Sequence, residues 1–229
     1  MNPRILAGIL WLTSVVAALI SLVIVIVFDV STLDPEVETT LRKIAQNSGA
    51  HIVELLFDIL SGIALVAAAA PLYVIFSQYD RTLALMGSYL FVGYGIIVAV
   101  HDMENLALTW VAEAFVEASA TEATALALIG QSLILTAKWG VSIFVVFILL
   151  GAFVYSYLLV ANQLSKLVGW FGVIAGVLGL VAVPLQLIDP TLEEIGFLLF
   201  LPFLIWQFVF GGYLLWSKSL ASEPSNVGM

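Results

Sequence analysis

Six long runs of apolar residues, almost free of charge, fix what this chain can fold into. An α-helix rises about 1.5 Å per residue, so about 20 apolar residues cross the hydrocarbon core of a bilayer. The runs therefore predict six membrane-spanning helices. By residue number they are 5–28, 51–76, 82–110, 123–160, 167–187 and 192–216. The fourth is longer than one crossing needs, so we expect its first turns to stand outside the membrane.

The composition agrees with this architecture. The chain has 229 residues, of which 62% are hydrophobic and only 10% are charged, whereas a soluble domain carries about 25% charged residues. We therefore predict an all-α integral membrane bundle formed by a single domain over residues 1–229, with the lipid bilayer as its solvent. There is no cysteine, which excludes disulfides and thiolate metal sites. The net charge of −9 argues against nucleic acid as a partner.

The first apolar run also has features of a signal peptide, since Arg4 precedes it. The run is longer than the apolar part of a signal peptide and ends without a small-residue cleavage site. We therefore interpret it as the first membrane span. A short amphipathic helix is expected over residues 35–48, and an acidic connection over 113–122.

Basic residues predict the orientation, because Lys and Arg concentrate in cytoplasmic loops. Arg4, Arg81, Lys166 and Lys218 fall on one side of the predicted bundle. This side is predicted to be cytoplasmic, with both termini, in a multi-pass protein of the plasma membrane. The loops predicted to lie outside are acidic.

Ionisable residues cluster within the spans, where they are costly and usually mark a functional site. The second span carries His51, Glu54 and Asp58 on one helical face. In the third span, His101, Glu104 and Asn105 share a face, and Asp102 is predicted to point elsewhere. Lys138 of the fourth span and Gln186 of the fifth complete the set. Six of these residues lie about 28–34 Å from the cytoplasmic ends of their spans, near the outer edge of the hydrocarbon. They are Glu54, Asp58, His101, Glu104, Lys138 and Gln186.

The spacing His-x-x-Glu occurs twice, at His51–Glu54 and His101–Glu104. Imidazoles and carboxylates are ligands of di-iron, manganese, zinc and copper sites. One hypothesis is therefore a transition-metal site in the outer leaflet that acts on a lipid-soluble substrate. Its predicted ligands are His51, Glu54, Asp58, His101 and Glu104, supported by Lys138, Asn105 and Gln186. Carboxylate-bridged di-iron sites use the reverse order, Glu-x-x-His, and bis-histidine haem is disfavoured because the two rings differ in height by about 11 Å.

Two other hypotheses remain open from the sequence. The protein fits a non-catalytic subunit of a larger membrane complex, in which Lys138 pairs with Glu54 or Glu104. It also fits a small proton- or ion-coupled transporter, because His and carboxyl groups form proton relays. Whether the protein is an enzyme is not decided by the sequence.

The fifth span carries a stripe of small residues, Gly169, Gly172, Gly176 and Gly179. Gly172 and Gly176 form a GxxxG motif, which allows close approach of helix backbones. We expect it to serve packing within the bundle.

Several short segments together resemble an uncharacterised family of prokaryotic membrane proteins with six to seven spans, the domain of unknown function 4386. These segments are Arg4–Gly8, Asp58 with Pro71–Tyr73, Arg81–Leu85, Tyr157–Leu159, and Leu164–Gly169 with Ala175–Gly176. The resemblance implies a membrane bundle and no established activity. The chain departs from the family pattern in the third span, where Phe91 and Gly95 stand in place of an Arg and a Glu. The segment His101–Asn105 is particular to this chain.

Overall fold

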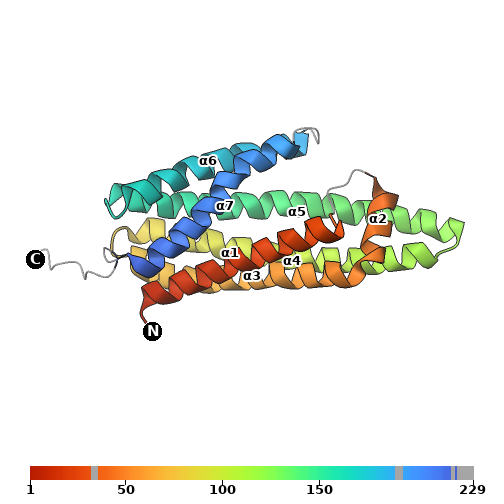
Figure 1. The fold of residues 1–229 in the computed structure, drawn as a ribbon, viewed down its shortest axis with the longest axis horizontal. Helices are drawn as coiled ribbons and strands as arrows, with labels where there is room; N and C mark the ends of the chain where they lie inside the picture. The colour runs from red at the N-terminus through yellow and green to blue at the C-terminus, as the bar shows by residue number, and fades with distance from the viewer. Residues whose placement is uncertain (32–35, 189–192, 218–219, 221–229) are drawn as a thin grey trace, which may run out of the picture. The chain divides into compact units, whose positions relative to one another are not determined.

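The computed structural model describes residues 1–31, 36–188, 193–217 and 220, except the side chains of 185–188, 193, 194 and 197. The described chain is helical throughout, without a strand (Figure 1). Its helices are α1 (Pro3–Phe28), α2 (Val37–Gln46), α3 (Ser48–Phe76), α4 (Arg81–Glu117), α5 (Ala120–Ala161), α6 (Lys166–Ile188) and α7 (Glu193–Trp216). All except α2 are long and apolar enough to cross a membrane. The prediction of a six-span helical membrane protein is confirmed, and α2 is the predicted amphipathic helix.

The acidic connection predicted over residues 113–122 is wrong in length. Helix α4 continues to Glu117, and α5 begins at Ala120. Alanine and glutamate are strong helix formers, so this acidic segment prolongs both helices. Ser119 then caps α5, because its backbone N–H and its hydroxyl both donate to the Glu122 carboxylate, at 3.0 and 2.7 Å.

The chain divides into two compact units, each built from separate stretches of sequence. The first unit contains residues 1–15, 63–95 and 144–229, and the second contains 16–62 and 96–143. Four helices, α1, α3, α4 and α5, contribute a part to each unit. The prediction of one domain stays a prediction.

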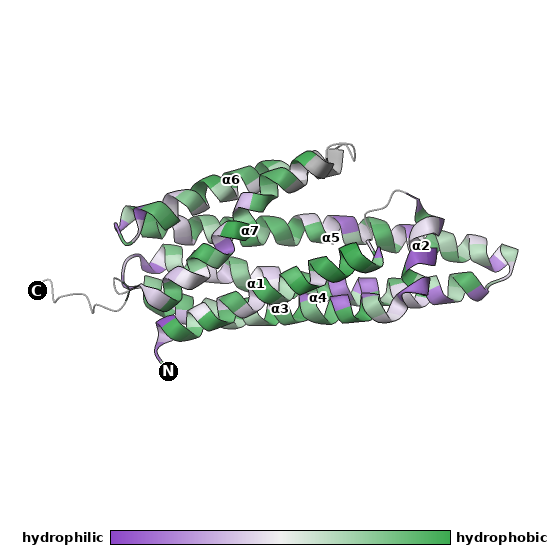
Figure 2. Cartoon of the chain, in the orientation of Figure 1, coloured by the Kyte–Doolittle hydropathy of each residue, from purple (hydrophilic) through white to green (hydrophobic). Residues whose placement is uncertain are grey.

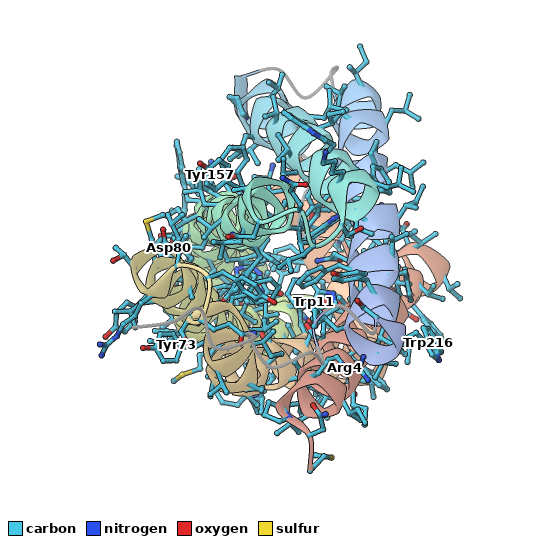
Figure 3. All side chains as sticks on the ribbon, turned by 90° about the vertical axis from the view of Figure 1, so that its left-hand side faces the viewer. Arg4, Trp11, Tyr73, Asp80, Tyr157 and Trp216 are labelled. Carbon is cyan, nitrogen blue, oxygen red and sulfur yellow. The ribbon has the colours of Figure 1, made fainter. Side chains whose placement is uncertain are left out.

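An aromatic core holds the first unit together around Trp11. This side chain is 1% exposed and lies in the interior of the helices, whereas Tyr157 and Trp216 lie at the outside (Figure 3). Its indole N–H donates to the backbone oxygen of Gln207 at 2.8 Å. Edge-to-face contacts join its ring to Phe91, Trp206 and Phe210. Such contacts add to the free energy gained by burying the aromatic surface.

Helices α6 and α7 pack against each other in the same unit. Trp206 of α7 donates its indole N–H to the backbone oxygen of Val168 at 3.0 Å. A side chain added at Gly172 would collide with Trp206 and with Ser156. The GxxxG glycine thus makes room for neighbours within the unit, as the sequence analysis expected.

In the second unit, α2 runs across the long helices rather than along them (Figure 1). Leu41 and Ile44 of α2 are fully buried in a hydrophobic cluster with Leu108, Ala112, Phe115 and Ile134. The guanidinium of Arg42 lies 5.1 Å from the centre of the Phe115 ring. An ion pair of 3.0 Å between Lys43 and Asp29 links α2 to the end of α1. These contacts fix α2 on the α4–α5 hairpin.

Candidate functional site

Polar residues gather on neighbouring stretches of α3 and α4 in the second unit. Figure 2 shows them as purple segments in otherwise green helices, between the labels α4 and α2. The ionisable members are His51, Glu54, Asp58, His101 and Asp102, which we call the acid–histidine cluster. Four of the five are buried, and Asp58 is partly buried. Their surroundings are apolar, so each hydrogen bond inside the cluster is electrostatically stronger than it would be in water.

Asp102 belongs to this cluster, and the prediction that it points elsewhere was wrong. Its side chain is 2% exposed, and it lies within electrostatic reach of Asp58 and Glu54. The buried face of α4 includes His101, Asp102, Asn105 and Thr109. These positions centre on a direction about 60° from the face that the sequence analysis chose.

The two histidines are joined by a chain of hydrogen bonds. Nδ1 of His51 lies 2.8 Å from the hydroxyl oxygen of Thr109. The Thr109 hydroxyl donates to the backbone oxygen of Asn105 at 3.1 Å, and the Asn105 side-chain nitrogen lies 2.8 Å from Nε2 of His101. This series of hydrogen bonds connects α3 to α4 and orients both imidazole rings.

The carboxyl groups differ in how well they are bonded. Glu54 accepts a hydrogen bond of 2.9 Å from the hydroxyl of Ser21 on α1. Both carboxyl oxygens of Asp102 are buried without a hydrogen-bond partner among the described residues. The side-chain oxygen of Asn105 is in the same state. Buried polar atoms without partners are rare and costly in folded proteins, so their presence requires an explanation.

Gly140 of α5 lies against the ring of His101. A Cβ atom built at Gly140 would lie 2.8 Å from Nδ1 of His101. No real Cβ comes so close to a neighbour, so only glycine fits beside this imidazole. Nothing in the sequence pattern predicted a role for Gly140.

Two of the predicted residues, Glu104 and Lys138, are not brought into the cluster. Glu104 is only half-buried, on the side of α4 away from Asn105 and Thr109. Lys138 is half-buried, and within the described chain no ion pair joins it to Glu54 or Glu104. The side chain of Gln186 lies outside the described residues.

The predicted metal centre gains no support from this arrangement. Among the described residues, no three His, Asp or Glu side chains are placed to hold one metal ion. The two histidines are turned to Thr109 and Asn105, and Glu54 is turned to Ser21. The His-x-x-Glu spacing places two residues on one side of a helix, but the inward face of α4 excludes Glu104.

Four parts of the site were not predicted from the sequence: Asp102, Thr109, Ser21 and Gly140. A signal for one pair was present, because residues seven apart share a helical face and Asp102 and Thr109 have this spacing. Ser21 and Gly140 offered no such signal, because only the packing of α1 and α5 on the other helices reveals them.

Comparison with known proteins gives a family and no function. No curated protein and no solved structure matches this chain. A family described as "Domain of unknown function (DUF4386)" matches residues 6–217, which is nearly the whole chain and includes the acid–histidine cluster. The chain is therefore a six-span helical membrane protein that belongs to the DUF4386 family.

Proposed function

We propose that the protein is a small proton-coupled membrane transporter, and that the acid–histidine cluster is its proton-binding site. The observation that carries the proposal is the state of Asp102. Its carboxyl group is 2% exposed, lacks a hydrogen-bond partner among the described residues and lies near two further carboxyl groups.

Electrostatics limits what this group of acids can do. Glu54, Asp58 and Asp102 have no Lys or Arg as an ion-pair partner in the part of the chain that the structure describes. Three charged carboxylates cannot lie together in an apolar interior without compensation. At least one of them therefore holds a proton, or a cation binds among them. Such sites in membrane helices are typical of proton relays.

The histidines support the proton over a metal ion. The cluster lacks a set of three donors placed for one metal, whereas His51 lies within electrostatic reach of His101 and follows Thr109 in a hydrogen-bonded chain. Imidazole is the side chain whose charge changes near neutral pH. The geometry therefore favours groups that exchange protons with one another.

A purely structural role, as in a subunit of a larger complex, accounts less well for Asp102. Polar side chains that hold helices together do so through hydrogen bonds. The Asp102 carboxyl makes none within the described residues, so it contributes a cost to folding and no bond.

Infrared spectroscopy of the protein in lipid bilayers tests the proposal. We expect the carbonyl band of a protonated carboxylic acid near neutral pH, which Asp102→Asn removes or shifts. The matched control is Glu113→Gln, which changes an exposed acid of the same helix. Absence of any such band that depends on Asp102 would overturn the proposal.

Two companion measurements separate the rival functions. In liposomes under an imposed membrane potential, the wild-type chain should take up protons faster than Asp102→Asn. A protonated carboxyl without proton uptake would contradict proton conduction through the cluster and favour the role of a subunit. Elemental analysis that finds near-stoichiometric metal, lost in the folded His51→Ala/His101→Ala variant, would replace the proton with a metal ion.

A further inference from the structure

We infer that the two histidines of the cluster are not equivalent: Asn105 holds His101 as a neutral Nδ1–H ring, and His51 is the ring that accepts the proton. This inference rests on the proposed function and names the acceptor and the positioning residue within that site. The inference follows from which atoms can donate a hydrogen in the series of hydrogen bonds that links the two rings.

The hydroxyl of Thr109 has a single hydrogen. That hydrogen is donated to the backbone oxygen of Asn105 at 3.1 Å. The contact of 2.8 Å between Thr109 and Nδ1 of His51 must then use a hydrogen of the imidazole. His51 is therefore the Nδ1–H tautomer, and its Nε2 carries the lone pair. Among the described residues no hydrogen bond reaches this Nε2, so it is ready to accept a proton.

The second ring, His101, is bonded at its other nitrogen. The Asn105 side chain places its NH₂ group 2.8 Å from Nε2 of His101. An amide N–H can only donate, so Nε2 of His101 is the acceptor and its lone pair is occupied. The ring hydrogen of a neutral His101 is then on Nδ1. For His101 to take a proton at Nε2, the bond from Asn105 must break or the amide must turn over.

Packing keeps His101 in this position. Gly140 faces the Nδ1 edge of the ring, where a Cβ would lie 2.8 Å from the nitrogen. Asn105 is one turn further along α4 and holds the opposite nitrogen. The ring is thus fixed between α5 on one edge and the amide on the other, and both contacts lie in the second unit.

The described charged and titratable groups of this unit, apart from the two rings, lie on four helices and in the connection between α1 and α2. They are Asp29 and Glu36 in the connection, Glu38, Arg42 and Lys43 on α2, Glu54 and Asp58 on α3, Asp102, Glu104, Glu113 and Glu117 on α4, and Glu122 and Lys138 on α5. Of these, Glu54 is one helical turn from His51, and Asp102 is next to His101 in sequence. The proposed acceptor therefore has a carboxyl-bearing residue within one helical turn on the same helix.

The chain has only two histidines, so nitrogen NMR of ¹⁵N-histidine-labelled protein in lipid bilayers can observe each ring separately. A His51→Gln variant assigns the signals. We expect both neutral rings to carry the hydrogen on Nδ1. On acidification His51 should become doubly protonated, while His101 stays neutral over the same pH range.

Two variants test the positioning role. Asn105→Leu should free Nε2 of His101, which then titrates together with His51. Gly140→Ala should displace the ring and disturb the His101 signals with every ionisable group retained. Gly49→Ala is the matched control, because nothing lies within 4 Å of an added Cβ there. It should leave both signals unchanged.

An Nε2–H tautomer at His101, or simultaneous protonation of both rings in the wild-type chain, would overturn the inference. Because Gly140→Ala and Gly49→Ala make the same change of one methyl group, their thermal midpoints show whether the first one folds. The tautomers are read without any transport assay. The NMR test of the inference is therefore independent of the infrared result for Asp102, which tests the proposed function itself.

Discussion

At the scale of single residues, the buried carboxyl group of Asp102 is the feature of the cluster that is least favourable for the stability of the fold. A buried carboxyl without a bonding partner lowers the free energy of unfolding. Glu54, by contrast, accepts a hydrogen bond from Ser21. A residue that costs stability and is placed among other acids has the features of a functional site.

The first prediction concerns this cost. Asp102→Leu should raise the free energy of unfolding by about 1 kcal/mol or more, because an apolar side chain replaces an unbonded polar one. The same change should abolish the proton uptake proposed for the cluster. Thermal unfolding in a mild detergent measures the first effect, and Glu113→Leu on the exposed side of α4 is the control. A clear loss of stability in Asp102→Leu would indicate a structural role instead.

Thr109 gives the second prediction, since its hydroxyl oxygen lies 2.8 Å from Nδ1 of His51. Thr109→Val keeps the shape of the side chain and leaves the imidazole N–H without a partner, which should cost about 1 kcal/mol. Thr136→Val is a close control, because the Thr136 hydroxyl also donates to a carbonyl four residues back but is exposed. Equal thermal midpoints for the two variants would contradict a buried bond between His51 and Thr109.

The site could be predicted from sequence only in part, for a geometric reason. Helical periodicity correctly brought His51, Glu54 and Asp58 onto one face of α3, and it showed that α3 and α4 carry polar layers. It failed on α4, because the inward direction depends on how the helix packs and not on which residues are polar. An error of about 60° was enough to include Glu104 and to exclude Asp102.

At the scale of elements, the lengths of α4 and α5 exceed the need of a membrane crossing. Their 37 and 42 residues correspond to about 55 Å and about 63 Å, against a hydrocarbon core of about 30 Å. Both helices must therefore extend beyond the core or tilt strongly. The Ser119–Glu122 cap and the packing of Leu41 and Ile44 on α4 and α5 account for the ordered end of this hairpin.

The sequence predicted the spans well because the apolar runs are long. It could not place the ends of α4 and α5, because alanine-rich acidic segments form helices both inside and outside lipid.

The third prediction separates the two glycines of the GxxxG motif in α6. Gly172→Ala should lower the thermal midpoint, because the new methyl group meets Ser156 and Trp206. Gly176→Ala should be nearly neutral, because the nearest atoms to an added Cβ are 3.7 and 3.8 Å away. Thermal unfolding of the two variants in parallel gives the comparison. A large and equal loss in both would point to an interface that uses the whole motif, such as a dimer.

At the scale of the whole molecule, the distribution of basic residues predicts which side of the membrane each turn faces. The turn between α3 and α4 and the turn between α5 and α6 carry Arg81 and Lys166 at their ends, whereas the α4–α5 turn is flanked by Glu117 and Glu122. Because Lys and Arg favour the cytoplasmic side, the α4–α5 turn should face outward. The acid–histidine cluster lies on the parts of α3 and α4 that lead toward that turn, so protons should reach it from outside.

The fourth prediction tests this orientation with single cysteines, which the natural sequence lacks entirely. Ala120→Cys, exposed at the start of α5, should react with a membrane-impermeant maleimide in intact cells. Gln78→Cys, exposed in the α3–α4 turn, should react only after the membrane is permeabilised. The unmodified chain controls for background labelling.

The reverse labelling pattern would place the α4–α5 turn in the cytoplasm, and proton uptake through the cluster would then have to begin inside the cell. Labelling of both cysteines in intact cells would contradict an odd number of crossings between them, and with it the assignment of α4 as a span.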